Sequence, residues 1–433
     1  KNMIYNGSSY NENWKISKLA ELGTFARGVS KHRPRNDPKL FENGKYPLVQ
    51  TGDVKEATLY LSKHEQEYGD FGLKQSKLWN TGTLCITIAA NIAETAILAY
   101  PMCFPDSIVG FSAYPEKSSE EFMYYIFEYI KKSIQNAATG SIQDNINLEY
   151  LMSLDFKIPE KKYQDMIVLI LSSIDRKILI NNAINDNLEQ QAKLLYDYWF
   201  TQFDFPDENG KPYRSSGGKM VWNEQLKMEI PFSWICSKME NAIEAVRTGL
   251  NPRNNFQLGN GNIQYITVKN LCLNGSLDFS GCDTIDEQAR QIVHRRSDIQ
   301  RDDILFASIA PLGRCYLIQE NPTNWDINES VFSIRYNSSV LTAEYLYMNL
   351  QSETFVKRAT ACSTGSIFKG IRINSLMDSE IILPPLSVTK EFSKEIKPLF
   401  ALQKELDRET HTLIQLRDWL LPMLMNGQAT ISD

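Results

Sequence analysis

The chain has 433 residues, of which 42% are hydrophobic and 23% charged, and its formal net charge is -6. The length fits two to three domains of about 150 residues, and the composition excludes a disordered protein. The acidic balance argues against indiscriminate coating of nucleic acid but is compatible with a localised basic face. No stretch approaches the ~18 consecutive apolar residues of a membrane-spanning helix.

The seven cysteines and four histidines bear on metal sites and cellular location. The cysteines are scattered from Cys85 to Cys362 without a C-x-x-C pair, which argues against a disulfide framework and a structural zinc site. The first residues, Lys1 to Tyr10, are polar and do not resemble a secretory signal. We therefore expect a reducing, cytoplasmic location and no association with membranes.

Residues 14–158 are expected to form the first globular domain, of α+β class. Its short apolar runs are typical of strands, and one longer amphipathic stretch is typical of a helix. The expected strands and helix are residues 46–49, 84–88 and 121–134. Residues 27–39 are strongly basic, and Pro34 and Pro38 interrupt them, so this segment is expected to be a loop.

Residues 159–200 are expected to form a long helix. Apolar residues recur there in alternating steps of four and three, the pattern of a coiled-coil seam. The seam positions are Ile167, Leu171, Ile174, Ile178, Asn181, Asn185, Leu188, Ala192, Leu195 and Trp199. Polar seam residues such as Asn181 and Asn185 fix the alignment of paired helices at some cost in stability.

Residues 201–230 are expected to connect two halves of the chain. The stretch Asp204–Lys219 is rich in glycine, proline and serine, a composition typical of connectors. Pro206 and Asp207 with Lys211 resemble part of a nuclease carboxylate cluster. Because they lie in the connector, with no strand to hold a metal, a solvated segment is the better interpretation.

Residues 231–383 are expected to form a second domain that repeats the first. Trp14–Leu19 parallels Trp234–Met239 at a shift of 220, and Thr139–Ile142 parallels Thr364–Ile367 at a shift of 225. A collinear series of matches with so little drift indicates duplication. Strands are again expected at 263–268 and 304–309, and a helix at 344–356.

Residues 384–427 are expected to form a second long helix with the same seam. Its positions are Phe392, Ile396, Leu399, Gln403, Leu406, Thr410, Leu413, Arg417, Leu420 and Leu424. The two helices are expected to pair as an antiparallel coiled coil, which relates two similar α+β domains by a pseudo-two-fold internal repeat. The alternative is that each helix packs only on its own domain.

A search for catalytic signatures finds no phosphate-binding G-x-x-x-x-G-K-[ST] loop, no H-E-x-x-H and no G-x-S-x-G. Gly259–Asn262 lacks the third glycine of a nucleotide-binding turn and is interpreted as a plain turn before a strand. His294 beside Arg295 could act as a general base, but a solvated charged loop is the favoured interpretation. No catalytic residue is assigned.

Basic and amide side chains gather at equivalent places in both halves. Arginine and lysine bind phosphates and guanine, asparagine and glutamine bind adenine, and hydroxyl groups position phosphates. The candidate DNA-binding residues are Lys31, Arg33, Arg35, Gln135, Asn136, Thr139, Ser141, Gln143, Asn145, Arg247, Asn251, Arg253, Asn254, Arg295, Arg296, Lys357, Arg358, Thr364, Ser366, Lys369 and Arg372. Any one patch alone could be a solvated surface, and the repeated Thr-Gly-Ser could be a structural turn.

From Trp14 to Gln428 the chain resembles the specificity subunits of Type I restriction-modification enzymes. The resemblance rests on a proline-containing helix entry, the end of the connector, the re-entry into the second domain and the terminal segment. These segments are Leu383–Leu386, Gly217–Met220, Glu229–Trp234 and Leu420–Gln428. The first helix entry, Ile158–Lys161, departs from the pattern because it lacks the second proline.

The resemblance implies a non-catalytic chain whose two domains, 14–158 and 231–383, are target recognition domains for a bipartite double-stranded DNA site. It also implies two modification subunits, which methylate adenine, and two restriction subunits. S-adenosylmethionine, ATP and Mg²⁺ would then be held by these partners, with no cofactor or metal on this chain. A twin-domain scaffold that never touches DNA is the main alternative, and a hydrolase with an unrecognised site is another.

In that family context the long helices are expected to carry the modification subunits. The candidate apolar anchors are Tyr198, Trp199, Trp419 and Met423. Packing of the helix ends against the chain's own domains would explain the same aromatic residues. The two half-sites are expected to differ in sequence, because Arg33 and Arg35 of the first domain are matched by Asn251 and Arg253 in the second.

Overall fold

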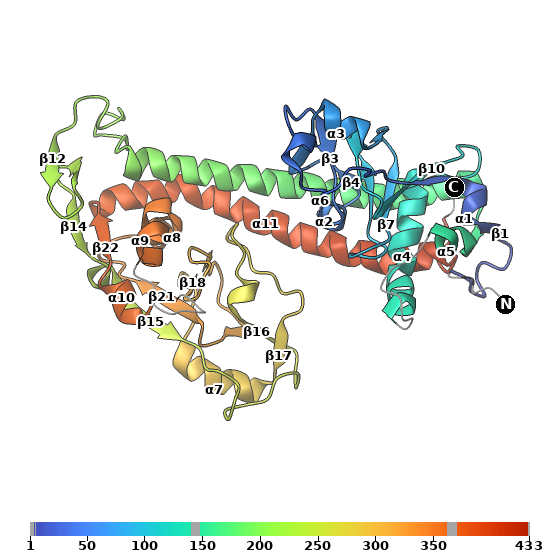
Figure 1. Ribbon diagram of the computed structural model, residues 1–433. Coiled ribbons are helices and arrows are strands. Elements are labelled where there is room, and N and C mark those ends of the chain that lie inside the picture. The colour runs from blue at the N-terminus through green and yellow to red at the C-terminus, as the bar shows by residue number, and fades with distance from the viewer. Residues whose placement is uncertain (1–3, 5, 140–147, 362–369, 432–433) are drawn as a thin grey trace. The chain divides into compact units, whose positions relative to one another are not determined.

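The computed structural model describes residues 4, 6–139, 148–361 and 370–431 (Figure 1). The chain divides into two compact units, one of Lys1–Asn181 with Glu409–Asp433 and one of Asn182–Arg408. Each unit combines an α+β domain with parts of the two long helices. The boundary between the units therefore falls inside both long helices. The sequence, by contrast, predicts each long helix as a segment separate from the two globular domains.

The main sheet of the first unit has five strands in the order β2-β10-β7-β8-β4. These strands are Gly23–Arg27, Ile108–Ala113, Leu84–Thr87, Thr95–Leu98 and Tyr60–Leu61. Every residue of β7 and β8 is buried, because helix α4 (Glu120–Thr139) covers one face of the sheet and the short helix α2 (Thr51–Glu56) packs on the other. Phe111, Phe122 and Phe127 are fully buried between the two layers.

A second, smaller sheet of the first unit has the order β5-β3-β9-β6. Its strands are Gln66–Tyr68, Tyr46–Leu48, Met102–Cys103 and Leu78–Trp79. Strand β1 (Lys15–Lys18) pairs separately with β11 (Asp155–Ile158), in antiparallel fashion. The short helices of this unit are α1 (Leu19–Leu22), η1 (Pro38–Leu40), α2 (Thr51–Glu56), α3 (Asp70–Lys74) and α5 (Leu148–Ser153).

The second unit has a main sheet of order β15-β21-β18-β19 and a smaller sheet of order β17-β16-β20. The strands of the main sheet are Ile243–Thr248, Val331–Tyr336, Ile304–Ala307 and Cys315–Leu317, and those of the smaller one are Asp283–Ile285, Ile263–Ile266 and Trp325–Ile327. Two further pairs are β12 (Met220–Asn223) with β13 (Met228–Pro231), and β14 (Ile235–Lys238) with β22 (Glu380–Leu383). Its helices are η3 (Met239–Asn241), η4 (Val268–Asn270), α7 (Glu287–Ser297), α8 (Ala343–Gln351), α9 (Glu353–Ala361) and α10 (Ile373–Met377).

The strand register confirms that one fold occurs twice. Lys15 pairs with Ile158 in the first unit, and Ile235 pairs with Leu383 in the second. The first residues of these pairs differ by 220 and the second by 225, the same shifts that the sequence matches show. In the smaller sheet of the first unit, β3 is antiparallel to β5 and parallel to β9. In that of the second unit, β16 is likewise antiparallel to β17 and parallel to β20.

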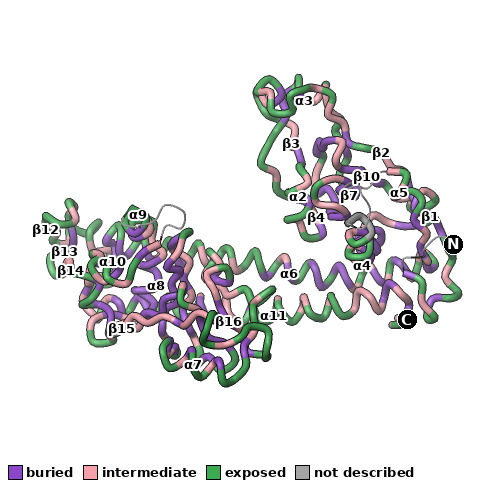
Figure 2. Tube along the Cα trace, turned by 60° about the horizontal axis from the view of Figure 1, so that its bottom comes forward, coloured by how far each residue is buried: buried purple, intermediate pink, exposed green. Residues whose placement is uncertain are grey.

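The long helices are α6 (Lys161–Tyr196), which ends in a π-helical turn at Asp197–Thr201, and α11 (Leu386–Met425). All the predicted seam positions are buried or half-buried (Figure 2). In the first unit Asn181 Nδ2 donates to Glu409 Oε2 at 2.8 Å, and in the second Asn185 Nδ2 donates to Asp407 Oδ1 at 2.7 Å. These contacts confirm antiparallel pairing, so the alternative without helix pairing is wrong.

Three expectations about local structure need correction. The connector is ordered, since it contains β12 and β13 and buries Phe203 and Phe205 against Trp234. The helix expected at 344–356 is two helices, because Ser352 adopts an extended conformation between them. The segment around His294 is helix α7 and not a loop.

None of the described helices is both long enough and apolar enough to cross a membrane.

Candidate nucleic-acid interface

In the first unit, Arg33 and Arg35 follow strand β2 on a loop that is tied to its neighbours. The backbone N–H groups of Gly28 and Val29 donate to Ile108 and Phe104. Arg35 Nη2 lies 2.5 Å from Asp106 Oδ1, and Arg33 Nη2 lies 3.9 Å from the other carboxylate oxygen. Both guanidinium groups remain about half exposed, so this loop presents two arginines that share one acid.

Neighbouring groups stabilise the same loop. His32 Nε2 contacts Asp37 Oδ2 at 2.7 Å, and the hydrogen bond from His32 is the main reason that the pKa of Asp37 is lowered. Arg33 Nη1 donates to the carbonyl oxygens of Ser30 and His32 at 2.6 and 2.9 Å. The side chain of Lys31 is exposed beside them. The loop is therefore held in one shape while its cations face solvent.

Gln135 near the end of α4 has a structural contact. Its Nε2 donates to the carbonyl oxygen of Ile92 at 2.9 Å, within the turn that joins β7 to β8. Ala90 and Ala93 in this turn have φ angles of 61° and 60°, which ordinary residues rarely adopt. The exposed Asn136 follows Gln135 on the helix, and Thr139 is the last residue of α4.

Six of the predicted DNA-binding residues lie outside the described part of the chain. They are Ser141, Gln143, Asn145, Thr364, Ser366 and Lys369. The residues that follow the second Thr-Gly-Ser are described: Gly370 forms a bridge with Ile309, and Ile371 N–H donates to Ser308 at 2.9 Å. These contacts place Gly370 and Ile371 beside the turn between β18 and β19, the counterpart of the turn that Gln135 contacts.

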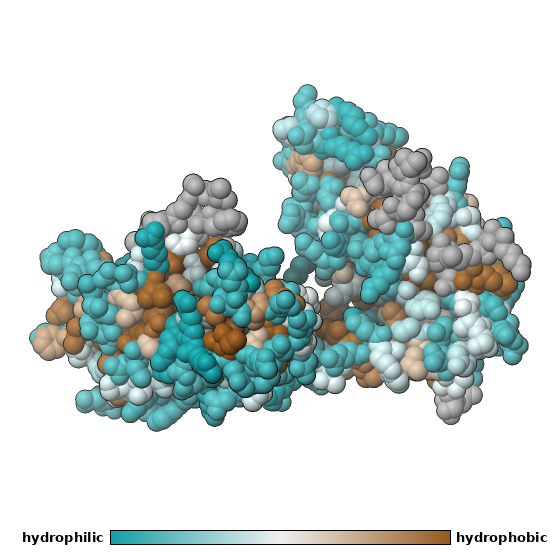
Figure 3. Space-filling model, turned by 90° about the horizontal axis from the view of Figure 1, so that it is seen from below, coloured by the Kyte–Doolittle hydropathy of each residue, from teal (hydrophilic) through white to brown (hydrophobic). Residues whose placement is uncertain are grey.

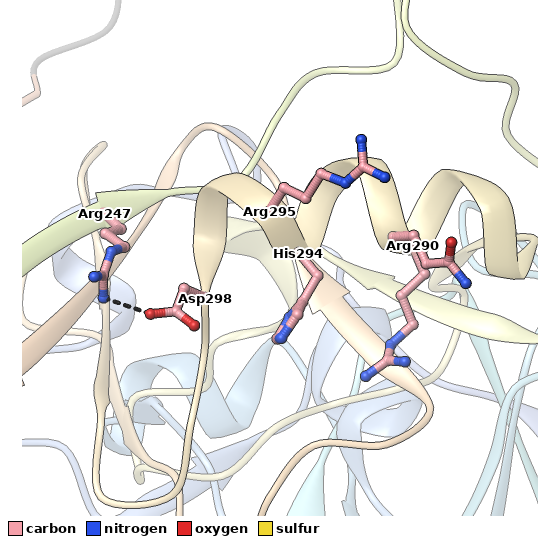
Figure 4. Close-up of a pocket in the computed structure, with 6 residues that line it drawn as sticks. Arg247, Arg290, His294, Arg295 and Asp298 are labelled. Atoms are coloured by element: carbon pink, nitrogen blue, oxygen red, sulfur yellow. Dashed lines mark ion pairs between the residues drawn. The ribbon is translucent and has the colours of Figure 1, made fainter.

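In the second unit, α7 and the edge of β15 line a cavity of about 420 Å³ that is open to solvent. Its lining residues are Arg247, Arg290, Gln291, His294, Arg295 and Asp298 (Figure 4). Arg247 Nη1 contacts Asp298 Oδ2 at 2.9 Å, and Arg296 Nε donates to Thr248 Oγ1 at 3.3 Å. In the described part of the chain no ion pair involves the exposed Arg295.

A buried carboxylate orients the imidazole of His294. His294 Nδ1 lies 3.0 Å from Asp326 Oδ2, and Ser297 Oγ donates to Asp326 Oδ1 at 2.6 Å. The side chain of Asp326 is 0% exposed, and this burial raises its pKa. His294 is therefore a fixed part of the cavity, in contrast to the solvated residue that the sequence suggested.

The remaining candidates of the second unit are spread over other elements. Asn251 and the exposed Arg253 and Asn254 lie in the loop after β15. Lys357 pairs with Glu353 and Arg358 with Glu380, at 2.5 and 3.7 Å. Arg372 precedes the short helix α10. Arg247 and Arg295 thus line the same cavity, whereas Lys357 and Arg358 each form an ion pair with a glutamate.

Several residues of these surfaces were missed at the level of sequence. Asp106 lies in the turn between β9 and β10, distant in sequence from Arg33 and Arg35, so no local pattern points to it. Helix α7 could have been found from Asp286, which caps the helix by accepting from Ala289 N–H at 2.8 Å, and from the spacing of Ala289, Val293 and Ser297.

Comparison with known proteins agrees with this arrangement. Residues 11–190 match the family model described as Type I restriction modification DNA specificity domain. The chain is 22% identical over 430 residues to the Type I restriction enzyme MjaIX specificity subunit of Methanocaldococcus jannaschii, covering 98% of this chain and 95% of that one. Over nearly its whole length the chain is therefore similar to a specificity subunit of a Type I restriction enzyme.

Two further known proteins are similar to this chain. The HindI specificity subunit of Haemophilus influenzae is 21% identical over 353 residues, which cover 70% of this chain and 74% of that protein. The crystal structure of the S subunit from M. genitalium has a TM-score of 0.60 at 15% identity, and the match covers 99% of this chain and 100% of that chain. This similarity shows a shared fold.

The candidate partner residues of this chain differ in exposure. Trp199 is only 5% exposed and packs 5.7 Å from the ring of Phe392, the packing against its own domain that the sequence left open. Tyr198 is 37% exposed and Trp419 is 59% exposed, whereas Met423 is half-buried. In the described residues no group of three His, Cys, Asp or Glu side chains could hold a metal ion.

Proposed function

We propose that this chain is the DNA-reading subunit of a Type I restriction-modification enzyme. In this proposal each α+β domain binds one short half-site of a duplex, and the DNA between the half-sites is not read. The observation that carries the proposal is the placement of basic loops after equivalent strands. Arg33 and Arg35 follow β2, and Arg253 follows β15, in two domains built on the same sheet order.

The half-sites are proposed to differ in sequence and to be read in opposite polarity. The loops after β2 and β15 carry different side chains, and arginine and asparagine favour different bases. The antiparallel pairing of α6 with α11 supports the opposite polarity, because the two equivalent long helices run in opposite directions.

Partner subunits are proposed to supply all chemistry. The duplicated fold offers two equivalent positions, which fits two modification subunits and two restriction subunits for each chain. The modification subunits would bring S-adenosylmethionine, and the restriction subunits would bring ATP and Mg²⁺. The proposal assigns this chain binding and positioning only, with no cofactor of its own.

The long helices are proposed to hold the modification subunits. Leu169 and Leu194 on α6 are 69% and 68% exposed, and Trp419 on α11 is 59% exposed. Large apolar side chains that face solvent on a helix are typical of residues covered by a partner. Tyr198 and Met423 lie on the same two elements, whereas the buried Trp199 contributes to this surface only by supporting its neighbours.

Footprinting of the assembled complex on its target DNA tests the proposal. We expect two protected half-sites with an unread spacer, their centres about one helical turn (~34 Å) or more apart. A single continuous block of sequence preference would contradict it. A scaffold without DNA binding would instead show no salt-dependent affinity for duplex DNA, even with the modification subunits present.

A further inference from the structure

Helix α7 has two faces of different character. Ala289, Val293 and Ser297 are buried at intervals of four residues, and they hold the helix against β20 and β15. Gln288, Gln291 and Arg295 are exposed on the opposite face. Ile292 lies on that face too and is 40% exposed. The spacing of these four residues, i, i+3, i+4 and i+7, places them in one stripe along the helix.

This stripe has the side chains that read bases in the major groove. Glutamine bonds the edge of adenine, arginine bonds the edge of guanine, and an apolar side chain contacts the methyl group of thymine. An 11-residue helix is about 16 Å long, and the major groove is about 12 Å wide and admits a helix. Hydrophilic side chains dominate the face shown in Figure 3.

The charges around α7 favour DNA and leave Arg295 available. Glu287 contacts Arg290 at 3.5 Å, and Asp298 contacts Arg247 at 2.9 Å and Arg335 at 3.1 Å. Glu287 and Asp298 thus have arginine partners, while Asp286 caps the helix and Asp326 contacts His294 and Ser297. In Figure 4, Arg295 is directed away from His294 and Arg290, which lie toward the sheet.

The first unit differs from the second at this point. The order β17-β16-β20 matches the first three strands of the sheet β5-β3-β9-β6, and a helix follows β5 as α7 follows β17. That helix, α3, has only 5 residues. Its Asp70 is bound to Lys45 and Tyr46, and its Phe71 packs edge-on against His32. The two domains therefore differ at the element that carries Gln288, Gln291, Ile292 and Arg295 in the second domain.

We propose that α7 is the major-groove recognition helix of the second domain. Gln291 and Arg295 contact base edges, supported by Gln288 and Ile292. His294, held by Asp326, is a positioning residue: together with Arg247 it lines the cavity that receives the DNA backbone beside the helix. The first domain, which has only the short α3, reads its half-site mainly through the loop of Arg33 and Arg35. This inference rests on the proposed function.

The experiment determines the base preference of the chain assembled with its modification subunits. Duplexes randomised in both half-sites are selected by binding and sequenced, for wild type and for Arg295→Ala and Gln291→Ala. We expect each variant to lose about tenfold or more of its preference at one or two positions of one half-site, with the other half-site unchanged. Lys227→Ala, in the turn between β12 and β13, is the matched control and is expected to change neither half-site.

The outcomes separate this inference from the proposed function. If wild type selects no sequence, the proposed function fails. If wild type selects two half-sites and both α7 variants keep the same preferences, the recognition helix is overturned while the proposed function stands. Uniform weakening for all sequences, with a shallower dependence on salt, would make α7 a phosphate-binding element and also overturn the inference. Thermal melting confirms that the variants are folded.

Discussion

Arg417 on α11 contacts the buried carboxylate of Asp175 on α6, with Nη1 3.2 Å from Oδ1. The other oxygen of Asp175 accepts from the hydroxyl of Tyr125 at 2.6 Å. Tyr125 lies on α4, which covers the main sheet of the first unit. One carboxylate therefore joins both long helices to the first domain.

Replacing Arg417 tests the importance of this contact. In Arg417→Met the carboxylate of Asp175, which is 4% exposed, loses its ion-pair partner in a buried place. We expect the free energy of unfolding of the first unit to fall by about 3 kcal/mol. Urea denaturation provides the measurement.

The matched control for this variant is Lys193→Met. Lys193 pairs with Glu189 on the surface of α6, and its side chain is 52% exposed. We expect a change of about 0.5 kcal/mol or less, since exposed pairs contribute little. Equal losses in the two variants would show that the contact between Arg417 and Asp175 has no special role.

Asn181 provides a second prediction, on the helix seam. Its side chain is fully buried, its Nδ2 donates to Glu409 and Thr410, and its Oδ1 has no partner among the described residues. We expect Asn181→Leu to increase stability by about 1 kcal/mol, because a leucine removes an unsatisfied polar atom from the seam. The register of the helices should become less strictly fixed.

Cysteines introduced at matched positions of α6 and α11 report that register. In the Asn181→Leu background, oxidation should yield cross-links one heptad out of register as well as the native one. A variant that is less stable than wild type and forms native cross-links alone would refute the register role.

The fold was predictable from sequence wherever a pattern is local or repeated. The heptad pattern predicted both long helices, because mostly apolar side chains recur at the same spacing in each of them. The shifts of 220 and 225 predicted the equivalence of β1 with β14 and of β11 with β22. The pairing of β16 with the distant β20 has no local signal, since a parallel pair depends on the intervening chain.

The candidate site was less predictable than the fold. Composition identified Arg247 and Arg295 but could not show that both line one cavity with His294. Asp326 lies on strand β20, 32 residues after His294, so the contact between these two side chains depends on tertiary structure. Sequence also could not distinguish Arg295, which has no ion pair among the described residues, from Arg358, which is paired with Glu380.

Acidification gives a third prediction, at Glu320 in the second unit. The hydrogen bond from Lys404 is the first cause that lowers the pKa of Glu320, and Arg408 adds to it. Because the folded pKa lies below the usual value of 4.5, this contribution to stability is present above pH 4.5 and is lost as the pH falls through the folded pKa. Wild type should therefore lose more stability than Glu320→Gln between pH 6 and pH 3. Parallel curves for the two proteins would contradict this role of Glu320.

The length of the long helices yields a fourth prediction. Both helices pass from one unit into the other. Insertion of seven residues after Ala183 and seven after Arg408 keeps the heptad phase and lengthens the pair by about 10 Å. We expect the preferred spacer to grow by about 3 base pairs while both half-sites keep their sequences, as read by methylome sequencing. A changed half-site sequence would refute the role of the helices in setting the spacer.

Asp106 supports a fifth prediction, on the first domain. Its carboxylate contacts Arg33 and Arg35 and would repel any DNA phosphate that these arginines bind. Asp106→Asn removes one negative charge from this loop, so affinity for all duplex sequences should rise severalfold at low salt and the gain should shrink as salt screens it. Arg35→Ala should lower affinity and reduce the slope of log affinity against log salt by about 0.9 if it binds one phosphate. Should Arg35→Ala instead change the preferred base at one position without altering the slope, Arg35 reads a base edge and Asp106 orients it.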